Sequence, residues 1–170
     1  MYQLDEPVKL LVLGTAQDGG YPHTGCSGAC CQEALRDETQ KRHIASLALL
    51  SGKKCILIDI TPDFKYQYRL IVNYLKEAPC ISGICITHAH LGHYLGLLEL
   101  GLEVMNTDSV PVYVMPKMKS FLENNEPFSQ LVNLKNINLI DILENRSFPI
   151  IENVHITPFQ VPHRNEFSET

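Results

Sequence analysis

The chain has 170 residues, of which 45% are hydrophobic and 19% charged, and its net charge is −5. This balance is typical of a globular protein with one hydrophobic core, so we expect a single domain over residues 1–170. No segment reaches the ~18 consecutive apolar residues of a membrane helix, and no Lys/Arg cluster indicates a nucleic-acid or anionic membrane surface. The first residues do not resemble a secretory signal, so we expect a cytoplasmic protein.

Apolar runs and helical spacing predict alternating strands and helices. In chain order, the expected elements are a strand at 8–14, a loop at 15–28, a helix at 29–41, two strands within 44–60, a helix at 61–79, a strand at 81–87, a helix at 95–106, a strand at 110–115, a helix at 116–125, and strands at 136–143 and 148–163. Ser27 and Thr61 are expected to cap the first two helices. Such alternation predicts an α/β layered protein.

A dense histidine cluster follows the strand expected at 81–87. His88, His90 and His93 occupy three of six consecutive positions. His88 and His90 point to one side of an extended chain, and His93 faces them if a helix starts just after His90. Neutral imidazole is a common ligand of zinc and iron. His163 also follows a strand-like run, which makes it a candidate further ligand for the same metal.

Several segments resemble, in order, the metallo-β-lactamase superfamily. Residues 87–93 (THAHLGH) resemble its T-H-x-H-x-D-H signature, residues 57–64 (LIDITPDF) its preceding strand and acidic turn, and residues 160–170 the segment with its next metal-binding histidine. Residues 13–31, with a glycine-rich turn and a cysteine cluster, are similar to the pyrroloquinoline quinone (PQQ) biosynthesis protein B branch.

The resemblance implies an αββα sandwich with a metal site at one edge of its sheets. In that fold His88, His90 and His163 would hold a first metal and His93 would belong to a second. The implied cofactor is one or two zinc ions, with iron or manganese as alternatives. The implied chemistry is attack of metal-bound hydroxide on an ester, amide or phosphoester of a small-molecule substrate.

The sequence departs from the family pattern in two places. The aspartate expected before the third histidine is Gly92 here, so the second metal lacks a usual ligand. Asp18 and His23 in the glycine-rich loop are candidate substitutes, although both also suit a turn. The chain also covers only the N-terminal portion of the family fold. If it ends at Thr170, an uncovered sheet face favours association into a homo-oligomer.

Three cysteines cluster in the loop before the first helix. Cys26, Cys30 and Cys31 are a candidate structural metal site, for which His43 could supply a fourth ligand, or they are reduced thiols without a metal. Tyr94, next to His93, is a candidate pocket residue.

Three functions stay open at this level. The first is a metal-dependent hydrolase of the metallo-β-lactamase fold. The second is an iron-dependent oxidation enzyme linked to the synthesis of a PQQ-like cofactor, because histidine-rich sites also suit iron. The third is a non-catalytic metal-binding protein.

Overall fold

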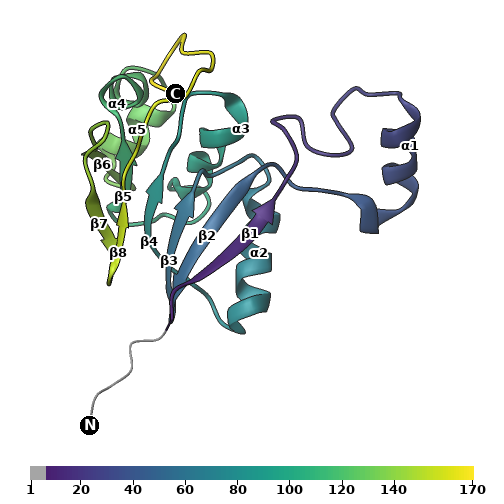
Figure 1. The fold of residues 1–170 in the computed structure, drawn as a ribbon, viewed down its shortest axis with the longest axis horizontal. Helices are drawn as coiled ribbons and strands as arrows, with labels where there is room; N and C mark the ends of the chain where they lie inside the picture. The colour runs from purple at the N-terminus through teal and green to yellow at the C-terminus, as the bar shows by residue number, and fades with distance from the viewer. Residues whose placement is uncertain (1–6) are drawn as a thin grey trace.

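The computed structural model describes residues 7–170 and contains a six-stranded mixed sheet (Figure 1). The strand order is β1-β2-β3-β4-β5-β6, with bounds Lys9–Gly14, Ser46–Ser51, Lys54–Ile58, Cys80–Cys85, Val110–Val114 and Ile137–Asp141. Strands β1 to β3 pair antiparallel, and β3 to β6 pair parallel. A hairpin of β7 (Phe148–Ile151) and β8 (Val154–Ile156) forms a separate small sheet.

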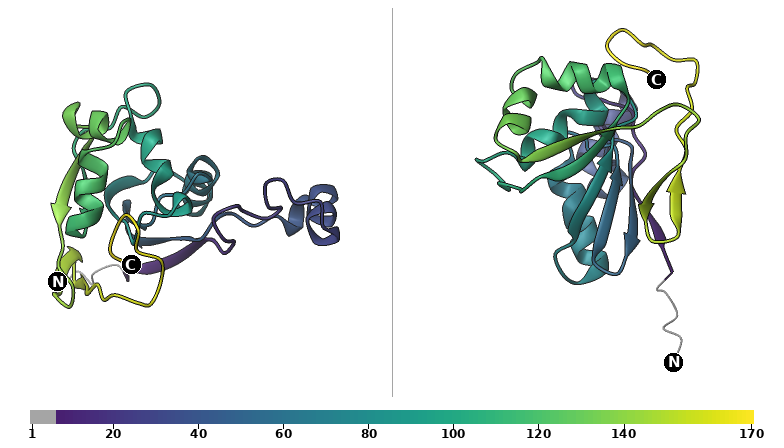
Figure 2. Two further views of the ribbon diagram at one scale, coloured as in Figure 1. Left: turned by 90° about the horizontal axis from the view of Figure 1, so that it is seen from above. Right: turned by 90° about the vertical axis from the view of Figure 1, so that its left-hand side faces the viewer.

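Helices cover one face of the large sheet and the β7–β8 hairpin covers part of the other (Figure 2). The helical segments are α1 (Ala29–Arg36), η1 (Glu38–Gln40), α2 (Phe64–Leu75), α3 (Leu91–Tyr94), η2 (Leu95–Leu100), α4 (Pro116–Glu123) and α5 (Phe128–Asn133). Parallel strands need crossover connections, and α2, α3 with η2, and α4 with α5 supply them between β3 and β6. The predicted α/β layered class is confirmed.

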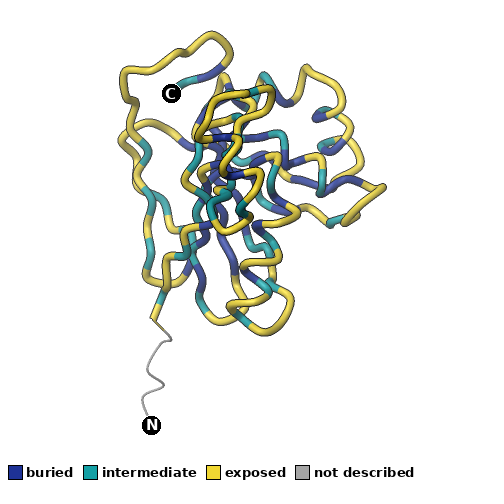
Figure 3. Tube along the Cα trace, turned by 90° about the vertical axis from the view of Figure 1, so that its right-hand side faces the viewer, coloured by how far each residue is buried: buried dark blue, intermediate teal, exposed yellow. Residues whose placement is uncertain are grey.

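Alternation along the strands separates two apolar clusters, one on each face of the sheet. The larger cluster, on the helix side, includes the fully buried Leu57, Ile84 and Leu97. The smaller cluster, on the hairpin side, centres on Ile56, Cys85 and Ile151. Figure 3 shows that the buried residues follow the strands, whereas most of the last segment is exposed.

All four predicted helices are shorter in the structure. Those expected at 61–79 and 116–125 are Phe64–Leu75 and Pro116–Glu123, and the other two end early for identifiable reasons. The helix expected at 29–41 ends at Arg36, because Asp37 is extended and its carboxylate accepts hydrogen bonds from the backbone and hydroxyl of Thr39, which starts a new turn. Its N-cap position is Gly28, so the predicted cap by Ser27 is wrong. The helix expected at 95–106 is only the short 3₁₀ segment η2, which stops at an extended Gly101.

Two parts of the second half differ from the expected elements. Helix α5 was not predicted, because six residues are too few to show a helical period. The strand expected at 148–163 is the β7–β8 hairpin, and the chain after Ile156 has no regular structure.

At α2 the N-cap position is Asp63, so the predicted cap by Thr61 is wrong. The Thr61 hydroxyl instead accepts from the Asp63 amide and donates to Gln67.

Residues 15–45 form an arm that carries α1 and extends beyond the edge of the sheet at β1 (Figures 1 and 2). The arm joins the ends of β1 and β2, where Ala16 pairs with Ile44 and Tyr21 with Arg42. Among residues 7–170, no helix has the length and apolar character needed to cross a membrane.

Candidate metal centre

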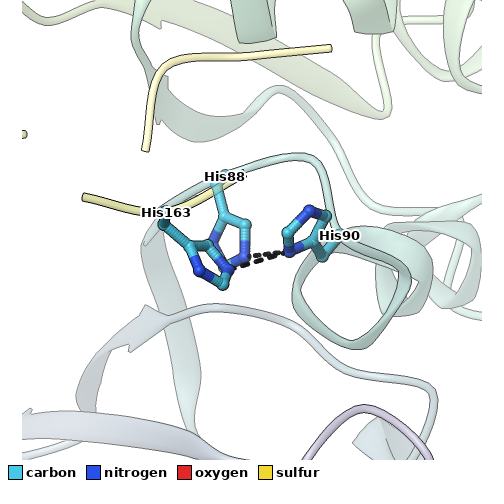
Figure 4. Close-up of side chains that lie close together, drawn as sticks. All are labelled: His88, His90 and His163. Atoms are coloured by element: carbon cyan, nitrogen blue, oxygen red, sulfur yellow. Dashed lines mark hydrogen bonds between the residues drawn. The ribbon is translucent and has the colours of Figure 1, made fainter. Parts of the chain in front are cut away.

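Three histidines from two distant parts of the chain meet at the carboxyl end of β4 (Figure 4). His88 and His90 lie in the loop after β4, and His163 lies in the segment after β8. The Nδ1 atom of His90 is 2.9 Å from Nε2 of His88 and 3.0 Å from Nε2 of His163. We call these residues the histidine triad. One ligand atom from each of the three residues lies within 4.8 Å of the other two, so the triad could hold one metal ion.

The segment that carries His163 is irregular but is tied to the triad loop. The backbone amide of Ala89 donates a buried 2.8 Å hydrogen bond to the hydroxyl of Ser168. The amide of Val161 donates to the carbonyl of Thr170 at 2.9 Å, which closes the segment into a loop around His163. His163 therefore reaches the triad on a segment anchored on both sides of it.

Asp59, directly after β3, fixes the tautomer of His88 through Thr87. Asp59 is 6% exposed and has a left-handed backbone with φ 62°. Its carboxylate accepts from the Thr87 amide at 2.8 Å, and the Thr87 hydroxyl lies 2.9 Å and 3.0 Å from its two oxygens. An ionised carboxylate only accepts, so the Thr87 hydroxyl donates to Asp59. The hydroxyl then accepts from Nδ1 of His88 at 2.9 Å, which leaves a lone pair on Nε2 in the triad.

The same carboxylate orients His93. Nδ1 of His93 lies 2.7 Å from Oδ2 of Asp59, and donation along this contact leaves Nε2 with the lone pair. Nε2 of His93 lies 3.5 Å from Oδ1 of Asp18. Burial of the His93 ring opposes a positive charge, but the carboxylates of Asp59 and Asp18 outweigh it and raise the pKa of His93. Burial and the neighbouring histidines lower the pKa of His88 to about 4, so this ring is neutral at neutral pH.

The ring nitrogens of His90 are better satisfied when the triad binds a cation than when it is metal-free. If Nδ1 of His90 holds the proton and donates to His88, its Nε2 is a buried acceptor with no hydrogen-bond partner among residues 7–170. If Nδ1 is unprotonated, its lone pair faces that of Nε2 of His88. A cation bound by the triad removes both conflicts and leaves Nε2–H of His90 3.7 Å from the Glu166 carboxylate. Three neutral imidazoles are also a suitable ligand set for zinc.

Replacing Asp59 with asparagine is expected to weaken zinc binding about 10- to 100-fold, the usual effect of losing an outer partner of a metal-binding histidine. Asparagine tolerates the left-handed backbone but offers one acceptor oxygen instead of two, so one histidine loses its fixed tautomer. Competition with a zinc-binding dye measures the affinity. Asp108→Asn, at an exposed position before β5, is the control. Equal affinities of the two variants would show that Asp59 does not orient the ligands.

Outside the histidine triad lie three other residues considered for a site: Tyr94, His23 and His43. Tyr94 is 5% exposed and packs in the core against Phe121 and Phe128. His23, in the arm, has its Nδ1 2.9 Å from the carbonyl of Thr24. His43, considered with the cysteines, lies 3.6 Å from the Asp63 carboxylate.

The cysteine cluster lies in and just before α1, in the arm that extends beyond the sheet edge (Figure 1). Sγ of Cys26 accepts from the Gly28 amide and Sγ of Cys31 from the His23 amide, both at 3.4 Å. Cys31 is buried and Cys30 is exposed. Within residues 7–170, the three thiols do not converge as the triad nitrogens do. A structural metal at Cys26, Cys30 and Cys31 therefore stays a prediction.

A cavity of about 400 Å³ adjoins the triad beside His88 and His163. Its wall is largely apolar. It comes from the ends of β3 to β6, the end of β8 and the segment after β8, with Ile58, Met115, Ile142, Ile156, Phe159 and Val161 among its residues. A ligand in this cavity would contact apolar side chains on one side and the triad on the other.

The fold and the triad together define an α/β protein with a histidine metal centre at the ends of its strands. Residues 54–169 match the family described as the beta-lactamase superfamily domain, so the chain belongs to this superfamily. The resemblance stated from the sequence is confirmed.

Among the proteins that the chain is similar to are several named for PQQ synthesis. The chain is 26% identical over 163 residues to coenzyme PQQ synthesis protein B of Xanthomonas campestris, covering 91% of this chain and 52% of the relative. Zinc-bound PqqB from Methylobacterium extorquens has a similar fold, with a TM-score of 0.78, 23% identity, and coverage of 90% of this chain and 52% of that one. A diphosphatase of the PhnP family aligns with a TM-score of 0.61 and 25% identity over 84% of this chain and 52% of that one. The chain thus spans about half the length of these relatives.

Proposed function

We propose that this chain carries the metal centre of a metal-dependent hydrolase that cleaves an ester, amide or phosphoester. The observation that carries the proposal is the histidine triad. Through Thr87, Asp59 holds His88 in the tautomer whose Nε2 lone pair faces Nδ1 of His90. His88, His90 and His163 would hold the ion. A bound Zn²⁺ acts as a Lewis acid and lowers the pKa of water to about 7. The similarity to a diphosphatase agrees with a hydrolytic role.

The surroundings of the triad suggest the kind of substrate. The cavity beside His88 and His163 is mainly apolar, so it favours a small molecule with an apolar group next to the bond that is cleaved. Asp59 and Thr87 would keep the His88 ring oriented while a cation is bound. Their hydrogen bonds reach Nδ1 of His88, whereas Nε2 is the atom that would face the cation.

Metal removal tests this function. The chain is stripped with a chelator, reloaded with zinc, manganese or iron, and assayed with p-nitrophenyl esters, anilides and phosphodiesters that carry short or long apolar groups. We expect turnover that disappears on stripping, returns on reloading, and favours the longer apolar groups. Metal binding without turnover of any substrate class would instead support a non-catalytic metal-binding protein.

A second candidate is an iron-dependent oxidation enzyme in the synthesis of a PQQ-like cofactor. The specific observation in its favour is the name of the relatives, coenzyme PQQ synthesis protein B. Histidine nitrogens suit iron as well as zinc. Oxygen consumption by the iron-loaded chain, absent with zinc, would favour this candidate over the hydrolase.

A further inference from the structure

We propose that Asp18 and His93 form a second cation site beside the histidine triad, with Asp18 supplying its carboxylate from the loop after β1. This inference rests on the proposed metal centre, because the second site adjoins the first. From the sequence, Asp18 and His23 are both candidate substitutes for the missing ligand, and both also suit a turn. The structure brings only Asp18 of these two into contact with His93.

The first observation is the spacing of the two ligand atoms. Nδ1 of His93 is occupied by Asp59, so Nε2 is the nitrogen available to an ion. Oδ1 of Asp18 lies 3.5 Å from this Nε2, which is long for a hydrogen bond between charged groups. Two ligands on one tetrahedral zinc ion lie roughly 3.4 Å apart, given metal–ligand distances of about 2.0–2.2 Å. The pair therefore has the spacing of two ligands that share an ion.

The second observation is the packing around Gly92. A Cβ atom on Gly92 would lie 2.8 Å from Cα and 2.9 Å from Cγ of Asp18, closer than real contacts allow. The Gly92 amide also lies 3.4 Å from Oδ2 of Asp18. The side chain of Asp18 thus fills the space that a side chain at position 92 would occupy. Glycine at this position lets the carboxylate of Asp18 stand next to His93.

The third observation is the position of the pair. The ring of His93 lies 4.2 Å from the ring of His88, centroid to centroid, so the pair directly adjoins the triad. The His93 side chain is 18% exposed and that of Asp18 is 47% exposed, so an ion can enter from solvent. Solvent or substrate atoms would complete its coordination. Two adjacent ions could contact both the attacking and the leaving oxygen of one substrate.

The test counts zinc ions per chain by elemental mass spectrometry and follows binding by calorimetric titration. We expect Asp18→Asn to bind one ion fewer than the unmodified chain, with affinity at the second site at least about 10-fold lower; an ion on the cysteine cluster would be counted equally in both chains. Glu33→Gln removes one carboxylate from α1 in the same arm and should bind as many ions as the unmodified chain. Equal ion counts with equal affinities in Asp18→Asn and the unmodified chain would overturn the second site and leave the proposed metal centre standing. No ion in the unmodified chain would overturn both.

Gly92→Ala supplies an independent variant, because it removes no ligand atom. Its methyl group should displace Asp18, so we expect loss of the second ion with the first retained. Circular dichroism spectra matching those of the unmodified chain would show that the variant is folded. A folded Gly92→Ala chain that binds as many ions as the unmodified chain, with unchanged affinity, would contradict the proposed placement of Asp18.

Discussion

The His90→Ala variant of this chain is expected to lose the metal ion of the triad. Nδ1 of His90 is the atom that lies within 3.0 Å of both other ligand nitrogens, so its removal leaves two ligands instead of three. Loss of an outer partner alone weakens metal sites 10- to 100-fold, so loss of a ligand should cost about 100-fold or more. Elemental mass spectrometry and zinc titration measure this loss, and metal-dependent turnover should fall with it.

His155→Ala is the matched control for this variant. His155 is exposed on β8, so its removal deletes an imidazole without touching the triad. Its zinc content and affinity should equal those of the unmodified chain. Equal zinc binding by His90→Ala and His155→Ala would mean that the bound ion lies elsewhere.

The largest expected effect on stability comes from Leu97→Ala. Leu97 in η2 is 0% exposed in the helix-side core, and truncation of a buried leucine to alanine typically costs about 2–5 kcal/mol. Its neighbour Leu98 is 38% exposed, so Leu98→Ala should lower the free energy of unfolding by less than about 1 kcal/mol. Urea denaturation of the metal-free variants measures both. Equal losses would show that η2 does not pack as described.

The sequence was most informative where local patterns were long. The strands from β1 to β6 and the helices α2 and α4 were predicted because apolar runs and helical spacing are local properties. The expected helix at 95–106 failed because Gly96 and Gly101 pack closely against other segments, and only the folded chain shows these contacts. Helix α5 was missed because its six residues are fixed by burying Phe128 and Leu131.

The sequence predicted the candidate metal ligands but not the residues that orient them. Dense spacing identified His88, His90 and His93, and its place after a strand-like run identified His163 as a further candidate ligand. Asp59 was seen only as part of an acidic turn, although an aspartate directly after a buried strand was a usable signal. Its contacts with Thr87 and His93 span 28 and 34 residues, beyond the reach of any local pattern. The role of Gly92 likewise depends on a loop 74 residues away.

The backbone of Asp59 limits how position 59 can change during evolution. Its φ of 62° lies in the left-handed region, which glycine adopts routinely and aspartate and asparagine adopt more readily than most other residues. Its orienting role requires two acceptor oxygens on a short side chain, which neither glycine nor asparagine provides. Aspartate meets both demands together, so we expect substitutions at this position to weaken the metal centre. A natural homologue that kept the four histidines but changed this residue would mark a lineage in which selection on the metal centre had relaxed while the fold persisted.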